Sequence, residues 1–470
     1  MEKYIERLES INSKIWDYAE LKFEEHKSSR ILQELLLEEG FEVKNNVADM
    51  ETAFIAKFGK GKPVIGILAE FDALSGLSQK AGVDKEVIRE ECPNGHGCGH
   101  SLLGTGSVGA ALLIKDYLKK NNLEGTIVLA GCPAEEGGSG KTYMARAGLF
   151  DALDIALTWH PAGGYAVLTG SLQANCQVYF KFKGIASHAA GAPHLGRSAL
   201  DAVELMNVGV NYMREHMETT DRIHYAVIDT GGVSPNVVQS HAEVLYLIRS
   251  INTEKVNKLY NRVCKIAKGA ALMTETEVEI IFDKACSNVI SNSVLEKIIF
   301  ESMKEVPLPK YTKEELCNAI KIKKTISDTD RENDMSLLFS SPMEKEKLAK
   351  QYKECVMPDF IVDYRHQYIS IPGSSDVGDC SHVVPTAQFV AACFVPGTPG
   401  HSWQMVAQGK DKTAVKGMIY AAEVLAKAAE TIYNNPSIIE KAKEEFIQVT
   451  GGKKYVCPIP KEILPNMHKK

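Results

Sequence analysis

The sequence predicts an α/β protein that carries a second, smaller α+β domain as an insert. Over the first 170 residues, short apolar runs typical of buried strands alternate with helical segments, as in layered α/β folds. Between residues 171 and 289, the strands instead alternate apolar with polar residues, and the elements follow the β-α-β-β-α-β order of ferredoxin-like domains. The length of 470 residues allows roughly two or three domains of this kind.

The first domain is expected to alternate helices with buried strands. Apolar positions recur at helical spacing through the first forty residues, and Gly40 marks a helix end. The expected buried strands share a continuous apolar run and cover residues 64–69, 126–131, 154–160 and 386–397. Further helices are expected from about Ser101 and over about 411–433. We therefore assign residues 1–170 and 290–470 to this domain, which ends in a coil containing proline and lysine.

Residues 171–289 are assigned to the inserted domain. Its strands are expected at about 171–184, 223–231, 242–250 and 276–283, and its helices at about 197–216 and 253–272. Alternation of apolar and polar residues in the strands is typical of a sheet with one face in solvent. Residues 306–365, by contrast, are rich in charge and predict surface helices rather than strands.

Composition excludes several classes of partner. The chain has 54 basic and 60 acidic residues, a net charge of −6, without the basic excess typical of nucleic-acid binding. No apolar run approaches the ~18–20 residues of a membrane span, and the first residues lack the apolar core of a signal peptide. Eleven scattered cysteines fit reduced thiols better than a disulfide framework. We therefore expect a cytoplasmic protein that contacts neither nucleic acid nor membrane.

Four short segments carry side chains that can bind metals. They are GHGCGH with His96, Cys98 and His100, CPAEEGG with Glu135 and Glu136, LTWHP with His160, and PGTPGHSW with His401. Each follows or abuts an expected buried strand. Functional residues of open α/β sheets lie just beyond the carboxyl ends of such strands. The four segments, distant in sequence, are therefore expected to converge at one edge of the sheet.

The spacing within two of these segments suits metal chemistry. Cys98 and His100 are two residues apart, so their side chains point the same way in an extended segment. Glu135 and Glu136 are adjacent and tend to point in different directions, so one can bind metal while the other faces a reacting water. Each residue type also has an ordinary interpretation. The two glutamates can be a solvated acidic pair, the histidines can be core or surface residues, and Cys98 can be a buried thiol. His96 is ambiguous: the leading interpretation is that it supports a metal ligand or has a structural role, and the alternative is that it is a ligand itself.

Residues 104–109 match the dinucleotide-binding pattern G-x-G-x-x-G, which would indicate a nucleotide oxidoreductase. That pattern needs a strand directly before it and an acidic residue about twenty positions later. Here Cys-Gly-His-Ser-Leu-Leu precedes it, and Glu124 lies ahead of the next expected strand rather than at its end. The glycines are instead expected to allow close packing of a helix.

The four segments together resemble those of a known family. GHGCGH-LLG, PAEEGG-GK, TWHP and FVPGTPGHSWQ are similar to motifs of the two-metal amidohydrolases in the aminoacylase/carboxypeptidase superfamily, in the branch of auxin-conjugate and hippurate hydrolases. The similarity extends along nearly the whole chain, and residues 373–388 resemble the aminobenzoyl-glutamate type. The resemblance implies an α/β fold: a mixed-sheet di-metal catalytic domain with an inserted ferredoxin-like α+β lid domain. This agrees with the boundary placed at 171–289.

The resemblance also implies two divalent metal ions per chain, Zn²⁺, Mn²⁺ or Co²⁺. The implied ligands are Cys98, His100, Glu136, His160 and His401, with Glu135 as general base and Asp72 as the carboxylate that orients a metal-bound histidine. Most of the superfamily has His-x-Asp after the first buried strand and an aspartate that bridges the metals. Here Glu70-Phe71-Asp72 and Cys98 stand at those positions, departures that the auxin-conjugate branch shares.

Three residues of the inserted domain gain roles from the same resemblance. His188 in KGIASHAA matches a histidine that reaches an active site, often across a dimer, and that could stabilise an oxyanion. Asn236 and Arg249 match positions that bind or orient the substrate carboxylate, for which a planar guanidinium is suited. For His188 and Arg249, the alternative is an ordinary exposed side chain. A homodimer formed through the lid is the implied assembly.

The implied activity is hydrolysis of the amide between an acyl or aroyl group and an amino acid, such as p-aminobenzoyl-glutamate. A dipeptidase or an N-acyl-amino-acid deacylase with the same site is the alternative specificity. The alternative of another class is a non-catalytic partner in a heterodimer. Such a partner is expected to lose ligands or the base, whereas this chain keeps five candidate ligands and Glu135.

Overall fold

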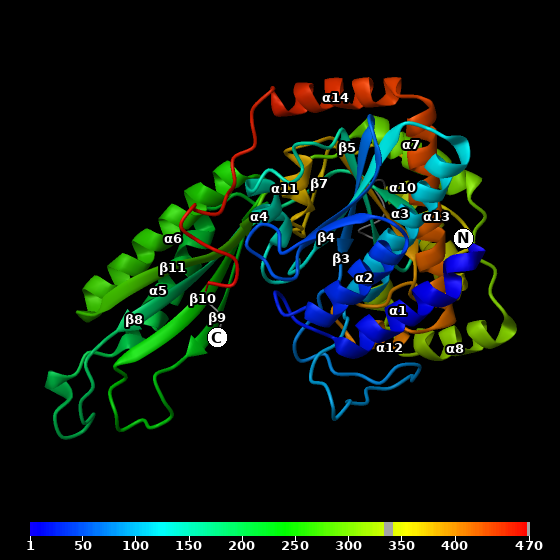
Figure 1. Cartoon of the computed structure of the whole chain (residues 1–470). Helices are drawn as coiled ribbons and strands as arrows, with labels where there is room; N and C mark the ends of the chain where they lie inside the picture. Colours follow the sequence, from blue (N-terminus) through cyan, green and yellow to red (C-terminus); the bar gives the residue numbers. More distant parts are fainter. Residues whose placement is uncertain (333–341, 468–470) are drawn as a thin grey trace. The chain divides into compact units, whose positions relative to one another are not determined.

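The structure, a computed structural model, describes residues 1–332 and 342–467 (Figure 1). The chain divides into two compact units, each described below by itself. The first unit contains residues 1–170 and the described parts of 290–371 and 380–455. The second contains residues 171–289, 372–379 and the described residues from Val456 on. The segment 372–379 and the end of the chain thus group with the second unit, although the sequence-based assignment places them in the first domain.

The first unit is built on a seven-stranded mixed sheet, which confirms the predicted α/β class. Its strands are β1 (Glu42–Asn45), β2 (Phe54–Lys60), β3 (Val64–Glu70), β4 (Gly125–Cys132), β5 (Ile155–Ala162), β6 (Ala166–Leu168) and β13 (Thr386–Ala392), in the order β1-β2-β4-β3-β5-β13-β6. The four central strands pair in parallel and the outer pairs are antiparallel. The carboxyl ends of β3, β4, β5 and β13 therefore share one edge of the sheet.

Helices surround this sheet (Figure 1). They are α1 (Ile5–Tyr18), α2 (His26–Glu38), α3 (His100–Asn121), α4 (Gly140–Arg146), α7 (Ser293–Glu305), α8 (Lys313–Lys323), α10 (Pro342–Glu354), α12 (Trp403–Gln408), α13 (Lys412–Asn434) and α14 (Ser437–Thr450). Short pieces are η1 (Glu2–Tyr4) and β12 (Ser370–Ile371) in the first unit and β7 (Ser171–Leu172) in the second, and α11 (Val377–Ser381) has residues of both. The expected surface helices of 306–365 correspond to α8 and α10.

The glycines of α3 permit close packing, as predicted, and do not follow a strand. A Cβ on Gly104 would lie 2.4 Å from the carbonyl oxygen of Glu70, and one on Gly106 would lie 2.7 Å from the Trp159 ring. A Cβ on Gly109 would lie 2.9 Å from Leu8 of α1. These distances are shorter than van der Waals contact, so α3 reaches the sheet and α1 only because these positions lack side chains. The G-x-G-x-x-G run is therefore a packing surface.

The second unit has the predicted β-α-β-β-α-β order. Its elements are β8 (Ala174–Lys183), α5 (Ala199–Met213), β9 (Arg222–Asp229), β10 (His241–Ser250), α6 (Thr253–Thr274) and β11 (Glu277–Cys286), with short helices η2 (Pro193–Leu195) and η3 (Arg214–His216). The four strands form an antiparallel sheet in the order β11-β8-β10-β9, on which α5 and α6 pack (Figure 1). This is the ferredoxin-like arrangement.

Several elements were not predicted from the sequence. Among them are β1, β2, β6, α4, α7, α12 and α14. β1 and β2 lie at the edge of the sheet and expose many of their residues, so they lack the continuous apolar run that marks β3 and β4. Among the described residues, no helix combines the length and the apolar character that crossing a membrane requires.

Candidate metal centre

The four predicted segments converge at the edge of the first sheet. Glu135 and Glu136 follow β4, and His160 lies near the end of β5. His100 is the first residue of α3, and His401 lies in the loop after β13. A hydrogen bond of 2.9 Å from the His401 backbone N–H to the carbonyl oxygen of Gly97 joins the last of these loops to the segment that carries Cys98.

The donor atoms form three groups, and two of these share one sulfur. In the first group, donor atoms of Cys98, His100 and His160 lie within 4.8 Å of one another. In the second, those of Cys98, Glu136 and His401 lie within the same distance. The Cys98 Sγ is 3.4 Å from His160 Nε2, and His401 Nε2 is 3.4 Å from a Glu136 oxygen. Cys98 therefore lies where a ligand common to two ions would lie.

Hydrogen bonds orient the imidazoles of buried His100 and half-buried His160. His100 Nδ1 donates to Asp72 at 2.9 Å, and His160 Nδ1 donates to the carbonyl oxygen of Pro161 at 2.9 Å. Each ring therefore directs its Nε2 lone pair toward Cys98 and its neighbours. The other Asp72 oxygen accepts the backbone N–H of Glu136 at 2.9 Å, so one buried carboxylate positions members of both donor groups.

The charges around Cys98 favour its thiolate. Burial and the nearby Glu136 carboxylate raise the pKa of the Cys98 thiol, but His100 and His160 outweigh them and lower it to about 6. Burial likewise raises the pKa of Glu136, whereas His401 and His100 lower it to about 2. Both groups are therefore ionised near neutral pH, and a deprotonated thiol and carboxylate are the forms that bind metal.

The residues present fit a metal ion. His100 is fully buried, and its Nε2 makes no hydrogen bond with any residue that the structure describes. This nitrogen lies within 4.8 Å of donor atoms of Cys98 and His160 and 3.3 Å from a Glu70 oxygen, so a cation between these donors would give the buried nitrogen a ligand bond. Two ligands of one tetrahedral zinc lie roughly 3.3–3.7 Å apart, given Zn–N and Zn–S bonds of about 2.0–2.3 Å. The 3.4 Å donor separations match that spacing.

A buried ion pair beside these donors escaped the sequence analysis. Lys141, in the first turn of α4, is fully buried and its Nζ lies 2.6 Å from Glu70 at the end of β3. The second Glu70 oxygen lies 3.3 Å from His100 Nε2. Burial raises the pKa of Glu70, but Lys141 and the histidines outweigh it and keep the carboxyl ionised. A lysine after glycines gives no sequence signal of burial, so the pair could not be predicted.

Glu135 belongs to the third group, with Glu70 and His100, and to neither of the two groups that share Cys98. A carboxylate oxygen of this half-buried residue is within 4.8 Å of donor atoms of His100 and Glu70.

His96 lies apart from that cluster of donors. It is buried, and its Nε2 donates to the carbonyl oxygen of Ile15 at 3.0 Å, which ties the GHGCGH loop to α1. Burial lowers the pKa of His96 to about 4, so it is a neutral structural histidine.

The other three expected site residues lie in the second unit. His188 is exposed, and its Nδ1 accepts the backbone N–H groups of Ala190 and Gly191 at 3.2 and 3.0 Å. Its proton is therefore on Nε2, which is available as a donor. Asn236 is exposed beside it, and its carbonyl oxygen accepts the Ala189 N–H at 3.0 Å.

Arg249 occupies a different part of the second unit. It is half-buried on β10, opposite Asn175 of β8, and its guanidinium donates to the hydroxyl of Ser374 at 3.1 Å. Ser374 belongs to the segment 373–388 that the sequence singled out. His188 lies beyond Lys183, at the opposite end of β8. The sheet therefore brings His188 and Asn236 together and separates both from Arg249.

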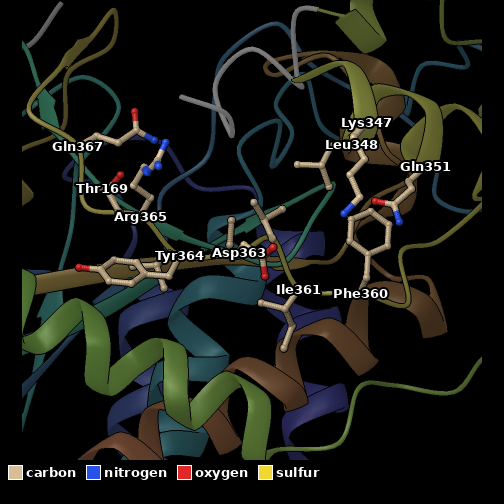
Figure 2. A pocket seen from close by; sticks show the side chains of 13 residues that line it. Thr169, Lys347, Leu348, Gln351, Phe360, Ile361, Asp363, Tyr364, Arg365 and Gln367 are labelled. Carbon is tan, nitrogen blue, oxygen red and sulfur yellow. The ribbon is translucent and has the colours of Figure 1, made fainter. Parts of the chain in front are cut away.

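A cavity of about 180 Å³ lies elsewhere in the first unit, between α10 and residues 360–367 (Figure 2). The charged side chains of Lys347, Asp363 and Arg365 line it together with the ring of Phe360. None of the metal-binding candidates lines this cavity. The charge-rich segment 306–365 thus supplies surface helices and a wall of this cavity, apart from the donor groups.

The fold and the donor set define a metal-binding hydrolase with an α/β core. Comparison with known families agrees, since the model of peptidase family M20/M25/M40 matches residues 71–463. The chain therefore belongs to the M20/M25/M40 peptidase family and is a hydrolase acting on amides. This confirms the resemblance stated on the sequence motifs.

Relatives and solved structures support this assignment. The chain is 45% identical to one of the subunits of p-aminobenzoyl-glutamate hydrolase from Escherichia coli (strain K12), over 98% of this chain and 96% of that protein. It is 29% identical to the Xaa-Arg dipeptidase of Homo sapiens, over 67% of this chain and 71% of that protein. Its fold resembles that of an aminobenzoyl-glutamate utilization protein from Klebsiella pneumoniae, with a TM-score of 0.60 and 18% identity over 93% of this chain and 98% of that one.

Proposed function

We propose that the protein hydrolyses the amide bond of N-aroyl amino acids, with p-aminobenzoyl-glutamate as the leading substrate and a role in folate catabolism. The observation that carries the proposal is the pair of donor groups joined at Cys98, with Glu135 beside them. The 45% identity to a p-aminobenzoyl-glutamate hydrolase chain supports the choice of substrate. None of the eleven cysteines, all of them within the described residues, is in a disulfide bond, which supports a reducing, cytoplasmic setting.

In this proposal two divalent ions occupy the donor groups. Cys98, His100 and His160 would hold the first, and Cys98, Glu136 and His401 would hold the second. When bound, the ions supply positive charge that polarises the substrate carbonyl and lowers the pKa of the attacking water. A thiolate with imidazoles suits Zn²⁺, Mn²⁺ or Co²⁺, and the sulfur favours the softer of these ions.

The chain's own residues then perform the proton transfers. Glu135 takes a proton from the water and delivers it to the leaving nitrogen. Asp72 keeps His100 in the tautomer that offers Nε2, through the 2.9 Å hydrogen bond to Nδ1. His188 donates from Nε2 to the carbonyl oxygen as negative charge develops on it. Asn236 and Arg249 bind or orient the α-carboxylate of the leaving amino acid.

The second unit supports a homodimer as the working form. Along β8, Asn175 and Lys183 are eight residues apart, which corresponds to roughly 26 Å of strand. Arg249 pairs opposite Asn175, whereas His188 follows Lys183. That separation exceeds the length of one aroyl amino acid. If both side chains contact one substrate, they come from different chains, as a dimer through this unit allows.

The second unit also offers a surface for such a dimer. β9 is an edge strand, and its Tyr225 and Val227 are 39% and 42% exposed. On α5, a stripe of Leu205, Val208 and Tyr212 is also exposed, the last of them at 75%. An edge strand with exposed apolar side chains pairs readily with another strand unless it is covered. A second copy of β9, from another chain, would pair with the free edge of this strand and cover its exposed apolar side chains.

Metal binding should protect Cys98 from modification. A metal-bound thiolate is shielded, whereas the apoprotein carries a thiol of lowered pKa. We expect a maleimide reagent to label Cys98 at least about tenfold faster in the apoprotein than in the metal-loaded protein. Peptide mapping measures the rate at this residue, and half-buried Cys264 of the second unit is the internal control. Equal rates at Cys98 in the two states would contradict the shared-ligand role.

Removal of Arg249 should weaken substrate binding. We expect Arg249→Ala to raise KM for p-aminobenzoyl-glutamate by about tenfold or more, because a charge-assisted contact to the α-carboxylate is lost. For a substrate amidated at that carboxylate, the same substitution should change KM little. Arg262→Ala, on α6 of the same unit, is the matched control and should leave KM unchanged. An equal rise in KM for both substrates would show that Arg249 does not contact the α-carboxylate.

A substrate panel tests the proposed specificity. After reconstitution with Zn²⁺, Mn²⁺ or Co²⁺, kcat/KM should be highest for p-aminobenzoyl-glutamate among N-aroyl and N-acyl amino acids and dipeptides. Faster hydrolysis of dipeptides with a C-terminal arginine would favour the dipeptidase specificity instead, as in the name of the human relative. Two bound ions without hydrolysis of any substrate would favour a non-catalytic role in a heterodimer.

A further inference from the structure

The segment that joins α1 to α2 contacts both loops that carry the candidate catalytic carboxylates. On one side, the carbonyl oxygen of Glu20 accepts the backbone N–H of Ala73 at 2.8 Å, directly after Asp72. On the other side, Lys22 donates to the carbonyl oxygen of Gly137 at 2.9 Å. Residues 20–25 therefore lie against the loops after β3 and β4 at the same time.

Glu25 makes the innermost of these contacts. Its side chain is fully buried, a rare position for a carboxyl group. One oxygen accepts the backbone N–H of Ala134 at 2.8 Å, and the other accepts the hydroxyl of Thr52 at 2.9 Å. Burial, followed by the charge of Asp72, raises the pKa of Glu25 to about 8. The group is thus held in place by two hydrogen bonds, and neither of these goes to a proposed metal ligand.

Ala134 is the residue that this contact fixes. Its φ of +60° lies in the left-handed region, which residues other than glycine rarely adopt. Such a conformation persists when surrounding contacts hold it. The Glu25 oxygen holds its N–H, and the Gly138 N–H donates to its carbonyl oxygen at 2.8 Å. Glu135 is the next residue, so the direction of its side chain depends on this turn.

We propose that Glu25 is a positioning residue for Glu135, acting through the buried hydrogen bond to the backbone N–H of Ala134. This inference rests on the proposed function, in which Glu135 is the general base. Glu136 has a separate anchor, because its own N–H donates to Asp72. Loss of the Glu25 contact should therefore disturb the base more than the metal ligands.

The expected signature is a loss of kcat without a loss of metal. A general base displaced by about 1 Å can cost up to ~10²-fold in rate, whereas substrate binding through other residues is retained. Glu25→Ala should thus lower kcat by about tenfold or more, change KM less than about threefold and leave two ions bound. Glu25→Gln should restore kcat to within about threefold of the unsubstituted protein. Its amide oxygen can accept from Ala134 and its NH₂ can donate to Thr52.

The experiment compares these variants in the full chain reconstituted with metal. It measures kcat and KM on p-aminobenzoyl-glutamate, bound metal by elemental analysis and the urea midpoint of unfolding. Asp154→Asn is the control for general loss of stability, since Asp154 is also buried and pairs with Lys443 and Lys62 before β5. It should lower the urea midpoint and leave kcat unchanged. If Glu25→Ala does not fold, Glu25→Asp applies the same test with a side chain too short for both hydrogen bonds.

Three results would overturn the inference. The first is an unchanged kcat in Glu25→Ala or Glu25→Asp. The second is a fall in kcat that parallels loss of bound metal. The third is a kcat in Glu25→Gln as low as in Glu25→Ala, because the amide keeps the hydrogen bond. Failure of the proposed function is seen separately: the unsubstituted protein would then not hydrolyse p-aminobenzoyl-glutamate, or Glu135→Gln would retain its activity.

Discussion

Glu135→Gln is expected to keep both metal ions and to lose nearly all turnover. The amide has almost the volume of the carboxylate but cannot accept the proton of the attacking water. Loss of a general base typically costs ~10²–10⁴-fold in rate, so kcat should fall by that factor while KM changes little. Steady-state kinetics on p-aminobenzoyl-glutamate, with elemental analysis of bound metal, measures both quantities.

The neighbouring residue provides a matched comparison. Glu136→Gln makes the same chemical change one position later, in a residue of the second donor group. We expect this variant to bind about one ion fewer, whereas Glu135→Gln binds as many as the unsubstituted protein. A Glu135→Gln enzyme with more than about a tenth of the original kcat would remove Glu135 from the role of base.

His188→Ala is expected to reduce kcat by about 10²–10³-fold, because a donor to the developing oxyanion acts mainly in the transition state. Mixing this inactive variant with inactive Glu135→Gln should restore activity if His188 serves the partner's site. Each mixed dimer then has one site with both residues intact. Random pairing should return about a quarter of the original activity.

A second mixture controls for exchange of chains between dimers. The double variant, with Glu135→Gln and His188→Ala in the same chain, is mixed with the unsubstituted protein. If His188 acts across the dimer, the mixed dimers have no intact site, so activity should fall below the sum of the separate proteins. If confirmed mixed dimers of the first kind stay inactive, His188 serves its own chain or has no catalytic role.

The parts of the fold that the sequence predicted are those in which one strand or helix carries its own signal. β3, β4, β5 and β13 are buried on both faces, so each appears as an apolar run. In contrast, β1 is largely exposed and β2 is only partly buried; β2 pairs with β4, and β1 pairs with β2. α14 follows a proline after a long helix, and its few buried positions leave a weak pattern.

The candidate site divides in the same way. Cys98 and its partners were predicted because their residue types and glycine-rich neighbours are unusual in sequence. Glu25 lies in the run Glu-Glu-His-Lys, which is typical of a solvated face, yet tertiary contacts bury it completely. The separation of His188 from Arg249 depends on strand register, which residue spacing along the chain does not reveal. These features therefore required the structure.

The sharing of Cys98 by both donor groups has a consequence for oxidative stress. An aspartate at a bridging position resists peroxide, whereas a half-buried thiolate can be oxidised to a sulfenic acid. Because the sulfur belongs to both groups, a single oxidation event would remove a ligand from each ion at once. Inactivation by peroxide should then follow one-hit kinetics, be slowed by bound metal and be reversed by a thiol reductant. The centre thus combines the affinity of sulfur for soft ions with a dependence on the reducing state of its surroundings.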